Sequence, residues 1–176
     1  MYEIAAASVA IPAPVTLPAV VTTAAAFAVI IAGAIDCNPA ELPMIQEAYA
    51  DLNKIVSSTA FEQQVINSAF TETNGMTSQQ IYDLIVSSSP ITVGFTMFTG
   101  SFIQNHITDT MGYEDPAHPG ICFANRHFIQ SKEVCGSLIL HETMHVIGFA
   151  HLGVKATSVP YTMNRIYDIV VQQLGI

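Results

Sequence analysis

Three of the six histidines in the chain fall within eleven residues, in the stretch HETMHVIGFAH at 141–151. His141 and His145 are four residues apart, so on a helix both imidazoles project from one face. At this spacing two ring nitrogens reach one Zn²⁺ at about 2.0–2.1 Å each. Glu142 lies about 100° further round the helix, beside the metal, where a general base for a water molecule is needed. The stretch therefore predicts a metal site with an adjacent base.

The third histidine joins this pair only if the helix stops. On an unbroken helix His151 would lie about 9 Å beyond His145 along the axis and on another face. Gly148 is expected to end the helix, because glycine adopts the left-handed conformation at little cost. The chain then turns and brings His151 back. At this composition the whole pattern has a chance probability of roughly two in a hundred thousand, so three ordinary core histidines are the weaker interpretation.

The same stretch fits H-E-x-x-H-x-x-G-x-x-H, and on it the chain resembles the metzincin zinc peptidases. Met163, in PYTMN, stands 12 residues after His151, in a place similar to the methionine turn of that family. The resemblance implies that His141, His145 and His151 bind one catalytic zinc, with water at the fourth position, and that Glu142 is the general base and acid. Residues 136–151 look most like astacins, whereas the short gap to the methionine looks like matrixins or adamalysins.

By this resemblance the protein is a zinc-dependent endopeptidase that cleaves protein or peptide substrates with metal-activated water. The stretch 121–129, ICFANRHFI, takes the place of the edge strand that pairs with an extended substrate in the family. Tyr161 is a candidate donor to the tetrahedral intermediate, with a core or rim tyrosine as the favoured alternative. A zinc-binding relative with altered catalysis, acting as a binding or structural component, is the alternative function, and intact Glu142 argues against it.

The elements around this site predict an α+β domain: helices first, then a small twisted sheet, a buried active-site helix and a C-terminal helix. Apolar residues recur at helical spacing, and β-branched and aromatic residues form the strands. The stretch 109–120 is a polar loop with two prolines and two glycines, and Asn164 is expected to cap the final helix. The expected helices are 38–56, 58–70, one opening at 77 or 78, 132–147 and one from 164; the strands are 91–98 and 121–129.

A catalytic domain is expected at 37–176, because 176 residues with 51% apolar and 11% charged residues suit one globular domain. Residues 1–36 carry Glu3 as their only charge before Asp36, and Ala32-Gly33-Ala34 fits a signal-peptide cleavage site. They are interpreted as a leader or pro-segment, or as a first strand in FAVIIAGAI, with a permanent membrane anchor third. We therefore expect a secreted or extracytoplasmic protein without a stable membrane span.

The basic residues, the cysteines and the remaining histidines and carboxylates indicate which other ligands and bonds the protein can have. Five Lys and Arg residues against a net charge of −9 leave no basic stripe, so nucleic acid is not an expected partner. Cys122 and Cys135 either form a bridge or remain two buried thiols. A second metal site, for Ca²⁺ or structural zinc, would need histidines and carboxylates that show no tight ligand spacing, so solvent-facing loop histidines are favoured. Those residues are His106, His118, His127, Asp109, Glu114 and Asp115.

Overall fold

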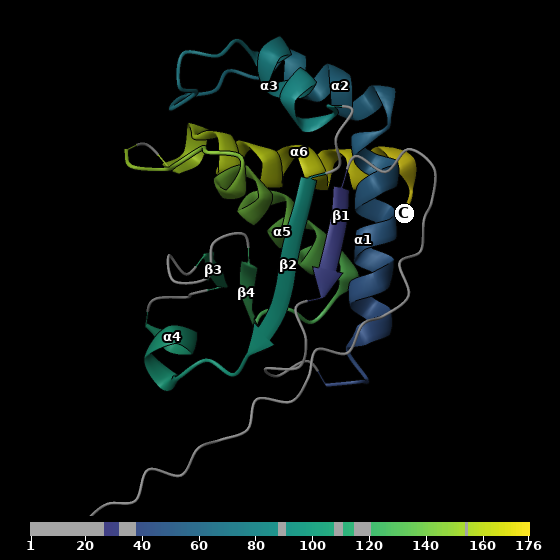
Figure 1. Cartoon of the computed structure of the whole chain (residues 1–176), viewed down its shortest axis with the longest axis vertical. Helices are drawn as coiled ribbons and strands as arrows, with labels where there is room; N and C mark the ends of the chain where they lie inside the picture. The colour runs from purple at the N-terminus through teal and green to yellow at the C-terminus, as the bar shows by residue number, and fades with distance from the viewer. Residues whose placement is uncertain (1–26, 32–37, 88–90, 108–110, 115–120, 154) are drawn as a thin grey trace, which may run out of the picture.

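Four short strands form one mixed sheet in the order β1-β2-β4-β3 (Figure 1). β1 and β4 both run parallel to β2, and β3 runs antiparallel to β4. The strands are β1 (Phe27–Ile31), β2 (Ile91–Phe98), β3 (Gly112–Glu114) and β4 (Ile121–Asn125). The computed structural model describes residues 27–31, 38–87, 91–107, 111–114, 121–153 and 155–176. Over this part of the chain the fold is α+β, as the sequence predicts.

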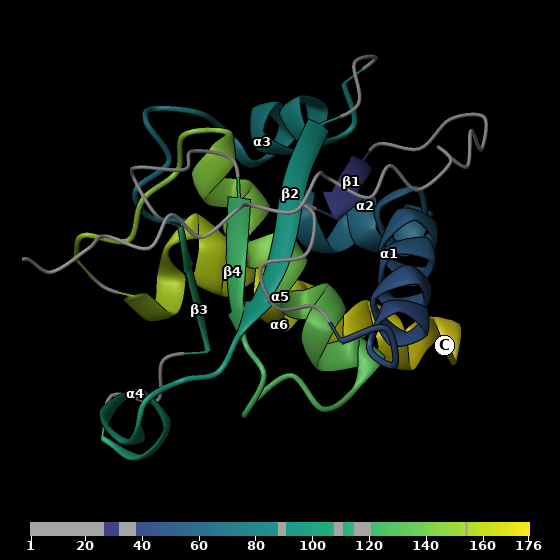
Figure 2. The same ribbon diagram turned by 60° about the horizontal axis from the view of Figure 1, so that its bottom comes forward.

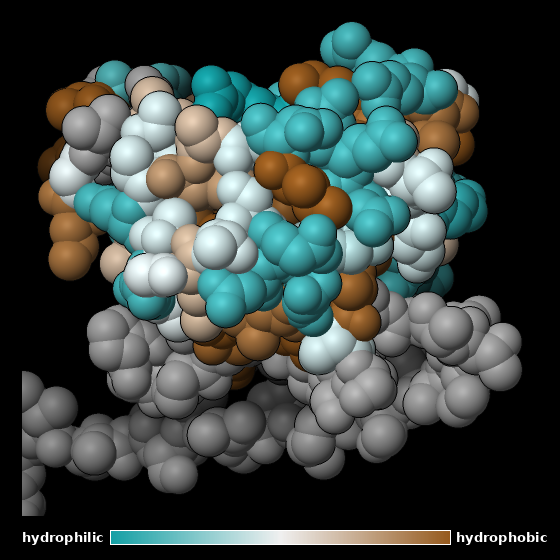
Figure 3. Space-filling view, turned by 90° about the horizontal axis from the view of Figure 1, so that it is seen from above, coloured by the Kyte–Doolittle hydropathy of each residue, from teal (hydrophilic) through white to brown (hydrophobic). Residues whose placement is uncertain are grey.

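α5 packs against the sheet, α1 and α6 pack against α5, and α2 and α3 lie together at one end of the molecule (Figures 1 and 2). The helices are α1 (Leu42–Val56), α2 (Thr59–Ile66), α3 (Ser78–Ile85), α4 (Phe102–His106), α5 (Lys132–Val146) and α6 (Val159–Leu174), with a 3₁₀ turn at Lys155–Thr157. None of the described helices is both long enough and apolar enough to cross a membrane. Viewed from the α2–α3 end, the described surface is largely hydrophilic with scattered apolar side chains (Figure 3).

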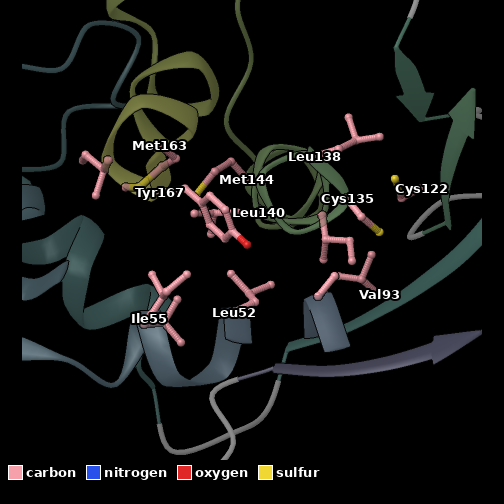
Figure 4. Packing of buried hydrophobic residues seen from close by; sticks show 14 of the residues in the cluster. Leu52, Ile55, Val93, Cys122, Cys135, Leu138, Leu140, Met144, Met163 and Tyr167 are labelled. Atoms are coloured by element: carbon pink, nitrogen blue, oxygen red, sulfur yellow. The ribbon is translucent and has the colours of Figure 1, made fainter. Parts of the chain in front are cut away.

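α5 is buried on nearly all sides and forms the centre of the core. Figure 4 shows its side chains pointing outward from the helix in several directions, towards α1, α6 and the sheet. Each fully buried side chain of this size contributes about 1.5–3 kcal/mol through the hydrophobic effect. The core around α5 includes Leu52, Ile55, Val93, Cys135, Leu138, Leu140, Met144, Met163 and Tyr167.

Two contacts fix α5 against its neighbours. At Gly136 a Cβ atom would lie 2.1 Å from the Tyr167 hydroxyl oxygen, so α5 and α6 approach closely only because residue 136 has no side chain. On the other side, the Asp51 carboxylate of α1 accepts a 2.6 Å bond from the Lys132 ammonium at the start of α5. The helix that carries the histidines is thus held from both α1 and α6.

Several sequence predictions need correction. α6 begins at Val159, after Ser158, so Asn164 lies inside the helix and does not cap it. Pro160 occupies the first turn, where a missing backbone N–H costs nothing, and it does not belong to a preceding loop. α2 ends at Ile66, four residues earlier than predicted.

The sheet also differs from the prediction. The polar loop at 109–120 contains β3, and the strand predicted at 121–129 ends at Asn125. β4 pairs with β2 on one side and β3 on the other. The prediction that 121–129 is the edge strand is therefore wrong, and β3 occupies that edge of the sheet.

The front of the chain contributes one strand. Phe27–Ile31 forms β1, which agrees with the first-strand interpretation of FAVIIAGAI. The predictions of a leader, a pro-segment and a cleavage site concern residues 1–26 and 32–37, which lie outside the described residues. No disulfide joins Cys122 and Cys135; both are buried thiols, one on β4 and one on α5.

Candidate metal centre

α5 carries the first two histidines on one face near its C-terminal end. Ser131 caps the helix, since its side-chain oxygen accepts from the Val134 N–H. His141 and His145, one turn apart, have ring centroids 5.1 Å from each other. His141 is 7% exposed and Glu142, the next residue, is 4% exposed. The helix therefore places two imidazoles and one carboxylate at the edge of the core.

The chain leaves the helix at Gly148 and returns His151 to this pair. Gly148 has a φ of +101°, and its N–H donates to the His145 carbonyl at 2.9 Å. After this turn the ring centroid of His151 lies 4.8 Å from that of His145 and 5.7 Å from that of His141. One potential ligand atom from each histidine lies within 4.8 Å of the other two. The helix and the turn at Gly148 thus bring together one ring nitrogen from each of the three histidines.

This group fits a metal ion with a small adjustment. Tetrahedral zinc places its nitrogen ligands about 3.3–3.4 Å apart, so ligand atoms within 4.8 Å of one another would have to draw together by up to about 1.5 Å. His145 has a defined tautomer, because its Nδ1 lies 2.7 Å from the Phe149 carbonyl oxygen, which can only accept. Nδ1 therefore carries the proton, and Nε2 is the nitrogen with a lone pair that can bind a metal. Such a backbone partner is typical of metal-binding histidines.

Electrostatics keep His141 neutral. Burial, followed by the charges of His145 and His151, lowers the pKa of His141 from 6.5 to about 3. The Asn164 side chain and the Pro160 carbonyl act in the opposite direction. Among the described residues, however, neither His141 Nδ1 nor Asn164 Oδ1 makes a hydrogen bond of full geometry. A neutral imidazole is the form that binds a metal.

Tyr161 is the fourth ring at the site. Its ring centroid lies 4.8 Å from that of His141, with the two planes at 90°, and 5.1 Å from that of His151. It reaches this position because α6 begins at Val159, so residue 161 sits in the first turn of the helix facing α5. The structure therefore places Tyr161 against two of the three histidines.

Met163 lies inside α6, fully buried, and not in a turn that precedes the helix. It packs in the core cluster with Met144 of α5 and Tyr167 of α6 (Figure 4). Its position within the helix differs from the methionine turn that the resemblance implied.

The second group of histidines is only partly described. His106 and His127 have ring centroids 5.4 Å apart and are both exposed. Asp109, Asp115 and His118 lie outside the described residues. Within the described ranges, the triad on α5 and its following loop is the only group of three His, Cys, Asp or Glu residues gathered closely enough to hold a metal.

Two residues near the site were missed in the sequence. Glu72 and Asn74, in the loop between α2 and α3, hydrogen-bond to the segment that carries His151. Asn74-Gly75 indicates a turn in the sequence, but nothing local indicates which distant segment that turn contacts.

Comparison with known proteins gives no relative. No protein-family model, no curated protein and no solved structure matches this chain.

Proposed function

We propose that the chain is a zinc-dependent endopeptidase of the metzincin type. The observation that carries the proposal is the convergence of His141, His145 and His151, whose ligand atoms lie within 4.8 Å of one another, next to the buried Glu142. Three imidazoles with no fourth protein ligand among the described residues favour an open zinc site over a closed structural one. The order of β1 followed by α1 also supports the proposal, since metzincins lead with a strand and then a helix.

The chain's own groups have distinct roles in this proposal. When bound, zinc supplies a Lewis acid that polarises a peptide carbonyl and lowers the pKa of water to about 7. Glu142 takes the proton of the attacking water and passes it to the leaving amine nitrogen. Tyr161, against His141 and His151, donates its hydroxyl proton in a hydrogen bond to the developing oxyanion.

β3 is the strand on which an extended substrate would bind. Among the described strands β3 pairs only with β4, which leaves its other edge for a peptide. β3 also packs against α5, the helix that carries His141. A peptide added to this edge would gain main-chain hydrogen bonds on a strand that packs against this helix. This assigns to Gly112–Glu114 the role that the sequence had suggested for 121–129.

The test compares the full chain with Glu142→Gln, after zinc loading and removal of free metal. Metal analysis is expected to give one zinc per chain for both proteins. Cleavage of a fluorescently labelled general protein substrate is expected to fall by about 10²-fold or more in Glu142→Gln, because the base is lost. Glu47→Gln, an exposed glutamate on α1, is the matched control and should cleave normally.

Three results would contradict parts of the proposal. Unchanged cleavage in Glu142→Gln would end the role of Glu142. Undiminished zinc content in His151→Ala would end the three-histidine site. A parent chain that binds zinc but cleaves no protein would favour the alternative, a zinc-binding protein that acts as a binding or structural component.

A further inference from the structure

The loop between α2 and α3 has an unusual backbone. Glu72 and Asn74, with φ of 58° and 54°, are the only non-glycine residues with positive φ in the described part of the chain. This conformation is unfavourable for L-residues, more so for glutamate than for asparagine. Strained backbone of this kind persists where surrounding contacts determine it, and it clusters at functional sites. The side chains of both residues reach the same distant segment, 148–153.

Glu72 holds the chain immediately after the third histidine. Its carboxylate accepts a 3.0 Å bond from the Leu152 N–H and a second, short bond from the Gly153 N–H. A carboxylate on two successive amides makes two charge-assisted bonds, which are stronger than neutral ones. A Cβ at position 153 would lie 3.0 Å from the carboxylate oxygen, so a larger residue there would displace the carboxylate by a few tenths of an ångström.

Asn74 holds the other end of the same segment. Its side-chain Nδ2 donates to the Gly148 carbonyl at 2.9 Å, at the residue where the chain leaves α5. Beyond the segment, the Thr71 N–H donates to the Thr157 carbonyl at 2.8 Å. In Figures 1 and 2 the α2–α3 loop and the segment before α6 lie on the same side of the molecule. The loop therefore contacts the chain both before and after His151, at residue 148 and at residues 152 and 153.

The position of His151 depends on these contacts from the α2–α3 loop. The His151 ring contacts those of His141, His145 and Tyr161. These ring contacts form only if the backbone brings His151 close to the other three rings. His141 and His145 are placed by a buried helix, whereas His151 stands on a short loop between Gly148 and the 3₁₀ turn. The contacts of the α2–α3 loop to residues 148, 152 and 153 therefore act together with the bonds of Phe149 to Met144 and His145 to set where the third ring lies.

We propose that Glu72 and Asn74 are positioning residues that hold the 148–153 segment so that His151 meets the other two histidines at the metal. This inference rests on the metal site of the proposed function and is independent of whether the bound metal serves proteolysis. Glu72 acts through the backbone of the third ligand, and Asn74 acts through the turn at Gly148. Neither touches the metal or a substrate.

The test measures zinc binding to the full chain in two variants. Asn74→Gly keeps the left-handed backbone without strain and removes only the amide, and Glu72→Ala removes the carboxylate. Ser58→Ala is the control, because it removes the α2 N-cap bond to the Phe61 N–H without touching 148–153. Zinc affinity is measured by competition with a chromogenic chelator, the visible spectrum of the Co²⁺-loaded protein reports ligand geometry, and thermal unfolding of the metal-free protein reports stability.

Glu72→Ala and Asn74→Gly are each expected to lower zinc affinity by about tenfold or more, the size seen when partners outside the metal ligands are removed. Their Co²⁺ spectra are expected to change, whereas Ser58→Ala loses stability and keeps both affinity and spectrum. A purely structural role would lower the stability of all three and leave affinity and spectrum intact.

The proposal is overturned if both loop variants bind zinc as tightly as the parent, or if Ser58→Ala loses as much affinity as they do. If Glu72→Ala does not fold, Asn74→Gly decides alone. A parent that binds zinc without cleaving protein ends the peptidase proposal and leaves this one standing. A parent that binds no zinc ends both.

Discussion

Replacing Gly148 by alanine tests the turn on which the third histidine depends. Gly148 has a φ of +101°, and an added Cβ would meet nothing within 4 Å. The substitution therefore introduces no clash, and its whole cost lies in the backbone. An L-residue at positive φ costs about 1–2 kcal/mol, and +101° lies beyond the centre of the left-handed region, which argues for the upper part of this range.

The conformational cost of alanine at position 148 lowers either the zinc affinity or the melting temperature. If the turn relaxes in the metal-free protein, metal binding has to restore it, and zinc affinity falls by about 5- to 30-fold for 1–2 kcal/mol. If the bond from Asn74 to the Gly148 carbonyl and that from the Phe149 N–H to the Met144 carbonyl prevent relaxation, the melting temperature falls by about 2–8 °C instead. The two losses together should amount to the strain of one residue.

Chelator competition and thermal unfolding measure the two losses on the same protein. Gly175→Ala is the matched control, since Gly175 also has positive φ, at +66°, and open space around its Cα, at the end of α6. It should leave zinc affinity unchanged. A Gly148→Ala protein that binds zinc and unfolds like the parent would refute the reasoning that this position requires glycine.

Three further outcomes are expected. Tyr161→Phe should keep zinc affinity, because the ring contacts with the histidines remain, and should lower kcat by about 10²-fold if the hydroxyl stabilises the oxyanion; an unchanged kcat assigns Tyr161 to packing. The metal-free protein should lose stability as the pH falls. Because the pKa of His141 drops from 6.5 to about 3 on folding, its contribution is complete above pH 6.5 and is lost towards pH 3, by about 2 kcal/mol between pH 7 and pH 5. Urea unfolding at the two pH values measures this, and His141→Gln should weaken the pH dependence. Gly136→Ala should lower the free energy of unfolding by about 1–3 kcal/mol, because its Cβ would lie 2.1 Å from the Tyr167 hydroxyl; a melting temperature equal to that of the parent would show that the α5–α6 contact adjusts freely.

The parts of the site that could be predicted are those encoded by local spacing. His141, His145 and the break at Gly148 follow from helical periodicity and the conformational freedom of glycine, and α5 has these features. The start of α6 was predicted too late because Pro160 fits both a loop and the first turn of a helix. Tyr161 was named as a candidate donor, and the earlier helix start places it in the first turn of α6, with its ring against that of His141.

The parts that could not be predicted depend on contacts across the fold. β3 has three residues in a polar stretch, and it is a strand because β4 offers it a partner. Glu72 and Asn74 are 80 and 74 residues from the groups that they bind. Their backbone conformation, which no local pattern shows, decides where their side chains point.

Two parts of the front half of the chain thus contact the elements that carry the candidate metal centre. Its sequence carries no metal-binding pattern, and the eleven residues at 141–151 contain the whole expected ligand set. Those residues alone, however, define only two ligands on a rigid helix and a third on a loop. The loop between α2 and α3 supplies the contacts to that third ligand's segment, and α1 fixes α5 through Asp51 and Lys132. The histidine motif supplies the atoms that could hold a metal, and in our proposal the α2–α3 loop and α1 help to bring those atoms to one place.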